Sequence, residues 1–250
     1  MKRFVASLAL GGLFACTPPV KPPPDAGVDT SCGLDCVAQQ RYGLIVKRCF
    51  EYSSTTSPVD PADLGAIVND VLTLEGGVQV LPVEYRQGGQ IRMTDHFIIR
   101  NGALLLARRT FLPGQSVNYR DTSGNIVGVT WLEPNSGVGN NVTTSAEATV
   151  VGSGANRTET TSYRVTMLAP TTLEQTVPNG TYDKSVKLLF NESPEHGSDA
   201  RRLWVKELGF TILSTTFNPV GGASQEFRLQ KVRDIGSPDG GSEECGLGHP

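Results

Sequence analysis

The stretch QIRMTDHFIIRNGALLLARRTFL, residues 90–112, decides the fold of this chain because it can be interpreted residue by residue as a β-hairpin. Asn101-Gly102 separates two runs of apolar and β-branched residues, and this dipeptide favours a two-residue hairpin turn because both positions must accept a positive φ. Pairing outward from the turn gathers apolar side chains on one face, in the pairs Ile99–Leu104 and Phe97–Leu106. The sequence therefore predicts antiparallel strands over Gln90–Arg100 and Ala103–Leu112.

The same register places one pair of opposite charges on the apolar face. Asp95 lies directly opposite Arg108, with Met93 opposite Thr110 beyond them, and His96 points to the other face. A charge in an apolar interior is costly without its partner, so we expect Asp95 and Arg108 to be in contact or to lie where water reaches them. Beside a cavity, the pair would be the best candidate for orienting a polar group of a ligand; otherwise it is a structural pair that closes one end of the core.

The turn before this hairpin must keep the apolar face continuous. A two-residue loop at Gly88-Gly89 would turn Arg86 and Glu84 toward the apolar face, since a slip of one residue exchanges the faces. A three-residue loop, Gln87–Gly89, is therefore predicted, with the pairs Tyr85–Ile91 and Val83–Met93 inside and Glu84–Arg92 outside.

The rest of the chain continues this pattern. Alternating apolar and polar residues predict further strands at 43–52, 77–85, 125–133, 143–151, 158–168, 185–190, 201–206, 210–217 and 226–232. One short helix is predicted from the N-cap Asp60 and Pro61, with an apolar face of Leu64, Ile67, Val68, Val71 and Leu72. Successive hairpins without helical crossovers predict a mainly β fold, a single antiparallel meander that forms an open or closed barrel. A two-sheet β-sandwich is the alternative.

The N-terminus has the parts of an export signal. Lys2 and Arg3 precede the apolar run Phe4–Leu13, which is shorter than the roughly 20 residues that span a bilayer. With Leu-Phe-Ala-Cys at 13–16, it resembles the lipobox signal of bacterial lipoproteins. The resemblance covers residues 1–16 and implies that residues 1–15 are removed and that Cys16 carries lipid, its thiol a diacylglycerol and its amine usually a further acyl chain. The alternative is a secreted protein cut after Ala15 with a free Cys16.

Residues 16–31 are interpreted as a lipidated tether. Five prolines between Thr17 and Ser31 favour an extended chain that cannot build a core. The resemblance implies a bacterial cell envelope protein bound to the lipid bilayer through acylated Cys16. Because Thr17 replaces the aspartate of inner-membrane lipoproteins, the outer membrane is expected, on either its periplasmic side or the cell surface. Residues 32–235 are expected to form one β domain, and residues 236–250 a flexible tail.

Four cysteines remain in the exported chain, and an even number predicts two disulfides. Three pairings of Cys32, Cys36, Cys49 and Cys245 are possible. We expect Cys245 to bond one of the other three, because its tail has few apolar residues that could order it. The spacing fits no zinc pattern, so no metal is expected.

Composition and motifs limit the function. Removing Lys2 and Arg3 with the leader changes the formal net charge from -3 to -5, which disfavours nucleic acid as a partner. No cofactor motif is found, and Arg201-Arg202 is interpreted as a solvated strand end. The sequence therefore favours a non-catalytic domain with a binding or structural role, its partner an envelope protein, glycan or apolar ligand. The alternative is a hydrolase using the loop residues Glu195, His196 and Asp199. A hollow interior would favour a carrier, and a filled one an interaction or structural role.

Overall fold

A computed structural model describes residues 33–54, 64–111, 114–152, 156–191, 201–206, 208–215, 225–235 and 245. All of them belong to the compact unit Ser31–Pro250. The leader, Cys16 and the proline-rich stretch lie outside the described residues.

The elements follow one another in a long series of strands with little helix. The helices are α1 (Leu34–Tyr42), the short 3-10 helix η1 (Glu75–Gly77) and α2 (Thr172–Gln175). The strands are β1 (Arg48–Ser54), β2 (Leu64–Val68), β3 (Leu72–Thr73), β4 (Gln79–Gln87), β5 (Gln90–Arg100), β6 (Ala103–Phe111), β7 (Gln115–Arg120), β8 (Val129–Leu132), β9 (Asn141–Val151), β10 (Arg157–Leu168), β11 (Thr176–Val177), β12 (Gly180–Thr181), β13 (Val186–Asn191), β14 (Arg201–Val205), β15 (Gly209–Thr215) and β16 (Gln225–Asp234).

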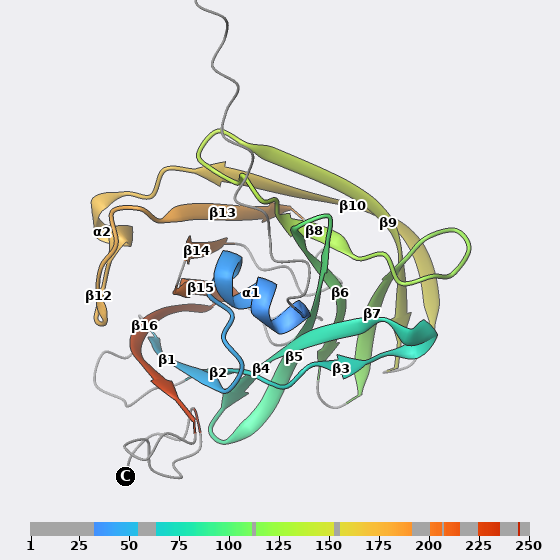
Figure 1. Ribbon diagram of the computed structural model, residues 1–250, viewed down its shortest axis with the longest axis horizontal. Coiled ribbons are helices and arrows are strands. Elements are labelled where there is room, and N and C mark those ends of the chain that lie inside the picture. Colours follow the sequence, from blue (N-terminus) through green and yellow to red (C-terminus); the bar gives the residue numbers. More distant parts are fainter. Residues whose placement is uncertain are drawn as a thin grey trace, which may run out of the picture. The chain divides into compact units, whose positions relative to one another are not determined.

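Twelve strands close into one antiparallel barrel (Figure 1). Around its wall the strands follow the chain in the order β1, β2, β4, β5, β6, β7, β9, β10, β13, β14, β15 and β16, and β16 pairs back with β1. Each strand of this ring pairs with a neighbouring strand on both sides, although within the described strands residues 157–163 of β10 pair with β9 alone. The predicted meander is confirmed in its closed form, and the sandwich alternative is wrong.

Four of the described strands lie outside the ring, and two of these, β3 and β8, pair with strands of the wall. β6 pairs with β8 through Leu104, Leu105 and Leu106, whereas its other half, from Arg108 to Phe111, pairs with β7. β3 pairs with the start of β4. The hairpin of β11 and β12, with α2, lies at the side of the barrel (Figure 1).

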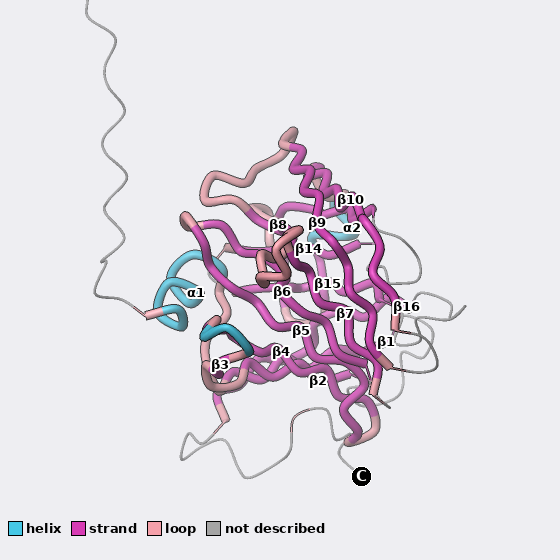
Figure 2. The backbone as a smooth tube through the Cα atoms, turned by 90° about the vertical axis from the view of Figure 1, so that its right-hand side faces the viewer, coloured by secondary structure: helices cyan, strands magenta, loops and turns pink. Residues whose placement is uncertain are grey.

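Helix α1 lies at one end of the barrel (Figure 2). Asp35 in its first turn and Arg41 in its last complement the helix dipole. Its last residue, Tyr42, donates its hydroxyl to the carbonyl of Gly102 in the β5–β6 turn, and its own carbonyl accepts from Trp204 Nε1 at 3.2 Å. Gly43 ends the helix at φ 69°, where a Cβ would lie 2.4 Å from the Gly209 nitrogen, so this close approach requires glycine.

The helix predicted from Asp60 is not formed by the residues of its apolar face. Leu64–Val68 is strand β2, and Leu72–Thr73 is strand β3; Asp60 and Pro61 lie outside the described residues. β2 is buried along its whole length because it pairs with β1 and β4 and closes the barrel. A strand buried on both faces is an unbroken apolar run, and over so few residues this pattern resembles the apolar face of a helix.

The Asn101-Gly102 hairpin forms with the predicted turn, both residues having positive φ. Ile99 pairs with Leu104 and Phe97 with Leu106, as predicted. Beyond them a bulge shifts the register, so that His96 faces Arg108, Asp95 faces Arg109 and Met93 faces Phe111. The predicted Asp95–Arg108 pairing is therefore wrong by one residue. The bulge places an extra residue, Ala107, in β6, and the side chains beyond it change faces.

The turn before this hairpin also differs from the prediction, and a bulge in β4 lies beside it. Gln87 pairs with Gln90 around a two-residue turn, so the predicted three-residue loop is wrong. A register shift between Tyr85 and Arg86 sets Tyr85 opposite Met93 and Val83 opposite Asp95, so the predicted pairs Tyr85–Ile91 and Val83–Met93 are wrong. The side chains of Tyr85 and Val83 are nevertheless buried, as predicted. Outside, Glu84 faces Thr94 rather than Arg92 and forms an ion pair with Arg86.

Candidate functional site

The barrel interior holds large side chains packed around Trp131 of β8. This indole is fully buried, and its centroid lies 5.0 Å from that of Phe97, 4.7 Å from that of Phe190 and 6.2 Å from that of Phe210. These rings come from β5, β13 and β15, on different sides of the wall. The interior around Trp131 is therefore filled by side chains.

A buried ion cluster lies in the same interior. Asp95 accepts from Arg109 through Nε at 2.6 Å and Nη2 at 3.2 Å, and from Arg202 Nη2 at 3.2 Å. Arg202 also donates to the Tyr85 hydroxyl at 2.7 Å. The side chains of Asp95 and both arginines are at most 1% exposed. One carboxylate on β5 thus connects two guanidiniums from β6 and β14 across the interior.

Aromatic faces supply part of the solvation that these charges lose. The Arg202 guanidinium carbon lies 4.4 Å from the Trp131 centroid, 5.1 Å from that of Phe210 and 5.4 Å from that of Tyr85. The Arg109 guanidinium carbon lies 5.7 Å from the Trp131 centroid. A desolvated cation over an aromatic face gains about 2 kcal/mol. The rings and Asp95 together stabilise the two buried guanidiniums.

Tyr52 of β1 contributes a buried hydroxyl to this region. Burial raises its pKa well above the usual value, the neighbouring Tyr85 raises it further, and Arg202 opposes both effects. The hydroxyl donates to the carbonyl of Phe210 at 2.8 Å. Tyr52 therefore stays a neutral donor and supplies no negative charge to the cluster.

Arg108, the predicted partner of Asp95, lies on the outer wall. It donates to Asn118 and to Glu75 of η1, and Glu75 also accepts from Arg120 at 2.6 Å. Burial raises the pKa of Glu75, but the two arginines outweigh that effect, and the pKa lies below its usual value. This bridge holds η1 against the barrel wall. Whether Asp95 or Arg108 lines a ligand site stays a prediction.

His96 lies beside Arg108, on the opposite face from Asp95 as predicted. The side chain is buried, and its Nδ1 has no hydrogen-bond partner among the described residues. Burial lowers its pKa, and the Arg108 charge lowers it further, against a smaller opposing effect of Asp95. His96 is therefore neutral where an unfolded chain would already take up a proton.

This difference predicts a pH dependence of stability. Above the unfolded pKa of about 6.5, His96 is neutral in both the folded and the unfolded state and adds no pH dependence to the free energy of unfolding. As the pH falls below it, the unfolded chain binds more protons, so stability decreases until the folded pKa is passed. We expect His96→Gln to lose less unfolding free energy than the wild type between pH 8 and pH 5 in urea titrations. His249→Gln is the control, and an equal loss in His96→Gln and the wild type would contradict the assignment.

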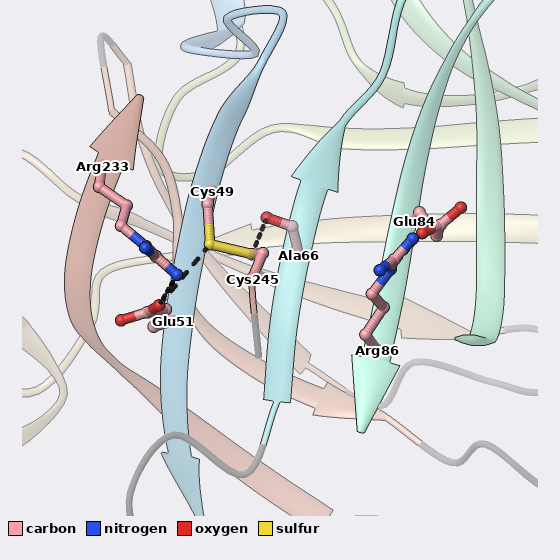
Figure 3. Close-up of a disulfide and its surroundings, with 7 residues drawn as sticks. All are labelled: Cys49, Glu51, Ala66, Glu84, Arg86, Arg233 and Cys245. Atoms are coloured by element: carbon pink, nitrogen blue, oxygen red, sulfur yellow. Dashed lines mark hydrogen bonds and ion pairs between the residues drawn. A yellow bond between two sulfur atoms is a disulfide. The ribbon is translucent and has the colours of Figure 1, made fainter. Parts of the chain in front are cut away.

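The outer wall also carries a disulfide between Cys49 of β1 and Cys245 (Figure 3). Their Cα atoms are 5.8 Å apart, and Cys245 Sγ lies 3.6 Å from the carbonyl oxygen of Ala66 on β2. On the same wall, Arg233 donates to Glu51 at 2.8 Å. The predicted bond from Cys245 to an N-terminal cysteine is confirmed. Cys36 is disulfide-bonded too, and Cys32 lies outside the described residues.

A surface hollow of about 530 Å³ lies beside α1. It is lined mainly by apolar side chains of α1, β5 and the segment before β4, with two polar ones: Leu34, Val37, Val78, Ile98, Gln79 and Arg100. Its volume is in the range of small-molecule sites. Asp95 and Arg108 are not among its lining residues.

The other predicted site residues are not brought together by the described structure. Cys16 and the loop residues Glu195, His196 and Asp199 lie outside the described residues; the loop connects β13 to β14. Among the residues that are described, no three His, Cys, Asp or Glu side chains form a cluster that could hold a metal. No helix in the described ranges is long and apolar enough to cross a bilayer.

Sequence reasoning missed Arg109, Arg202 and Trp131. The prediction that Arg201-Arg202 is a solvated strand end is wrong for Arg202, which is fully buried. Its strand continues with Leu203 and Trp204, both buried, and this apolar run was the signal for a buried strand. Comparisons with protein-family models, curated proteins and solved structures find no match to this chain.

Proposed function

We propose that this chain is a lipid-anchored bacterial envelope protein whose barrel is a non-catalytic binding or structural module. In this proposal Cys16 carries the lipid, and the proline-rich residues 17–31 hold the domain away from the membrane surface. The barrel then presents a rigid wall to an envelope protein or glycan.

The filled interior is the observation that carries the non-catalytic part of the proposal. Trp131 and its surrounding rings occupy the space that a carrier barrel would keep for an apolar ligand. The buried contact of Asp95 on β5 with Arg202 on β14 connects opposite walls, and Arg109 on the neighbouring strand β6 binds the same carboxylate. These features suit a barrel that keeps one shape while its outer surface makes the contacts.

The disulfides support an exported location. Cys49 and Cys245 are bonded, and Cys36 is bonded as well. Disulfides form and persist in oxidising compartments such as the periplasm and the cell surface, and are rare in the cytosol. This agrees with the export leader that the sequence predicts at residues 1–15.

Replacing Cys16 with serine tests the anchor. The wild type should fractionate with membranes and incorporate a labelled fatty acid, whereas Cys16→Ser should incorporate none, because the acylated thiol is lost. Thr17→Ser is the matched control and should behave as the wild type.

An uncleaved leader could itself keep Cys16→Ser at the membrane, so a second variant is needed. In it, residues 1–16 are replaced by the leader of an ordinary secreted protein. This variant should appear in the soluble fraction of the periplasm. Membrane association that persists in this variant, or lipid labelling of Cys16→Ser, would rule out the lipid anchor.

A further inference from the structure

The hollow beside α1 opens where β4 and β5 separate at one end of the barrel. The two strands pair as far as Leu81 and Phe97. Gln79 and Ile99 lie two residues beyond this pair and line the hollow, but the ladder does not join them. Helix α1, at this end of the barrel (Figure 2), contacts both strands and contributes a third side. The hollow is therefore bounded by two strand ends and a helix, and Trp131 is not among its described lining residues.

Four aliphatic side chains give the hollow an apolar lining. Ile98 is buried, whereas Leu34, Val37 and Val78 are half-buried and keep part of their surface in contact with water. Covering this surface with an apolar group is favourable in proportion to the area that leaves the water. The hollow therefore suits a ligand with an aliphatic body.

Arg100 is the one charged side chain among the described lining residues, and Asp35 of α1 is not one of them. Arg100 is exposed, donates from Nη2 to the carbonyl of Ile126 at 3.3 Å, and forms no ion pair with any described residue. A guanidinium has five N–H donors in a planar fork that matches a carboxylate, so most of its donors remain for a ligand. The exposed amide of Gln79 adds a neutral donor. One positive charge favours a single carboxylate over a phosphate group, which carries about two negative charges.

We propose that this hollow binds a small aliphatic monocarboxylate, a medium-chain fatty acid. The aliphatic chain lies against the four apolar side chains, and the carboxylate accepts hydrogen bonds from Arg100 and Gln79. The volume of about 530 Å³ accommodates such a chain. This site gives the domain a ligand outside the filled barrel interior, and it does not depend on the lipid anchor at Cys16.

Octanoate is the probe for this site, and octanol and acetate are its matched controls. Each is titrated into the secreted variant, in which residues 1–16 are replaced, because that protein needs no detergent that could enter the hollow. The isoleucine, leucine and valine methyl groups are labelled and followed by NMR. Octanoate should shift the methyl resonances of Leu34, Val37, Val78 and Ile98 in a saturable way. Octanol should bind more weakly because it has no charge, and acetate because it has no aliphatic chain.

Two arginines of β5 distinguish the charge at the hollow from charge elsewhere on the surface. Arg100→Gln should weaken the binding of octanoate by about fivefold, the upper range for an ion pair that solvent reaches, and leave that of octanol unchanged. Arg92→Gln removes an exposed charge from the same strand, away from the hollow, and should change neither affinity.

Three results would overturn the proposal. The first is the same octanoate affinity in Arg100→Gln as in the protein without this substitution, or octanol that binds as tightly as octanoate. The second is octanoate shifts at methyl groups away from the hollow in place of those that line it. The third is the absence of saturable shifts up to the solubility limit of octanoate.

Discussion

Replacing Asp95 with asparagine should lower the free energy of unfolding by about 3–5 kcal/mol, the cost of removing one partner from a buried ion pair. Asparagine keeps the volume, so packing in the interior is preserved. The loss is electrostatic, because Arg109 and Arg202 would lie in the interior without the carboxylate that they share. Urea titrations followed by circular dichroism measure it.

The same cluster predicts that replacing its different members lowers the free energy of unfolding by different amounts. Arg109→Met should cost less than Asp95→Asn, because Asp95 would keep its bond to Arg202 and the remaining pair would be neutral. Adding Arg109→Met to Asp95→Asn should recover part of the loss, since it removes one of the two buried charges that no longer face the Asp95 carboxylate.

The matched control is Glu84→Gln, which breaks the ion pair of Glu84 with Arg86 on the outer wall. Both side chains are partly exposed to solvent, so a loss below about 1 kcal/mol is expected. If Asp95→Asn cost no more than Glu84→Gln, the cluster would be no source of stability. If the double variant were no more stable than Asp95→Asn, the explanation by loss of the Asp95 charge would fail.

The sequence predicted the parts of the fold that depend on local chemistry. The turn at Asn101-Gly102 was predictable because few residues accept positive φ at both central positions of a tight hairpin. The antiparallel meander followed from short turns between strands, and Cys245 was tied correctly to the N-terminal cysteines.

The positions of the bulges could not be predicted from the sequence. Arg108 and Arg109 are adjacent and identical in type, so only the extra residue at Ala107 decides which of them enters the barrel. Without it, Arg108 would face Asp95. No composition rule places a bulge, because it is fixed by how the whole strand packs against its neighbours.

A second obstacle kept the sequence from predicting the buried cluster of Asp95, Arg109 and Arg202. Asp95 and Arg202 are separated by more than one hundred residues and belong to strands that are not neighbours in the wall. Strand pairing can be derived from turns, but contact across a barrel depends on its closure, which β2 completes. Because the residues of β2 were assigned to a helix, the sequence alone could not bring these side chains together.

Removing the Cys49–Cys245 disulfide is the second change that should lower the free energy of unfolding strongly. The two residues are 196 apart in the sequence, and closing so long a loop stabilises the folded state by about 5 kcal/mol in the chain-entropy model. Cys49→Ala with Cys245→Ala should therefore lower the unfolding free energy by up to about that amount. Both positions are buried, and replacing both cysteines with alanine leaves no free thiol in this buried site.

Two comparisons identify the source of this stability. A chain ending at residue 235 also lacks the bond, so it should match the double variant if the bond acts only by closing the loop. A larger loss on truncation would mean that the tail itself contributes contacts. Reduction should destabilise the wild type more than the double variant, which keeps the bond of Cys36. Equal urea midpoints for the oxidised wild type and the double variant would show that joining the two ends of the domain adds nothing to its stability.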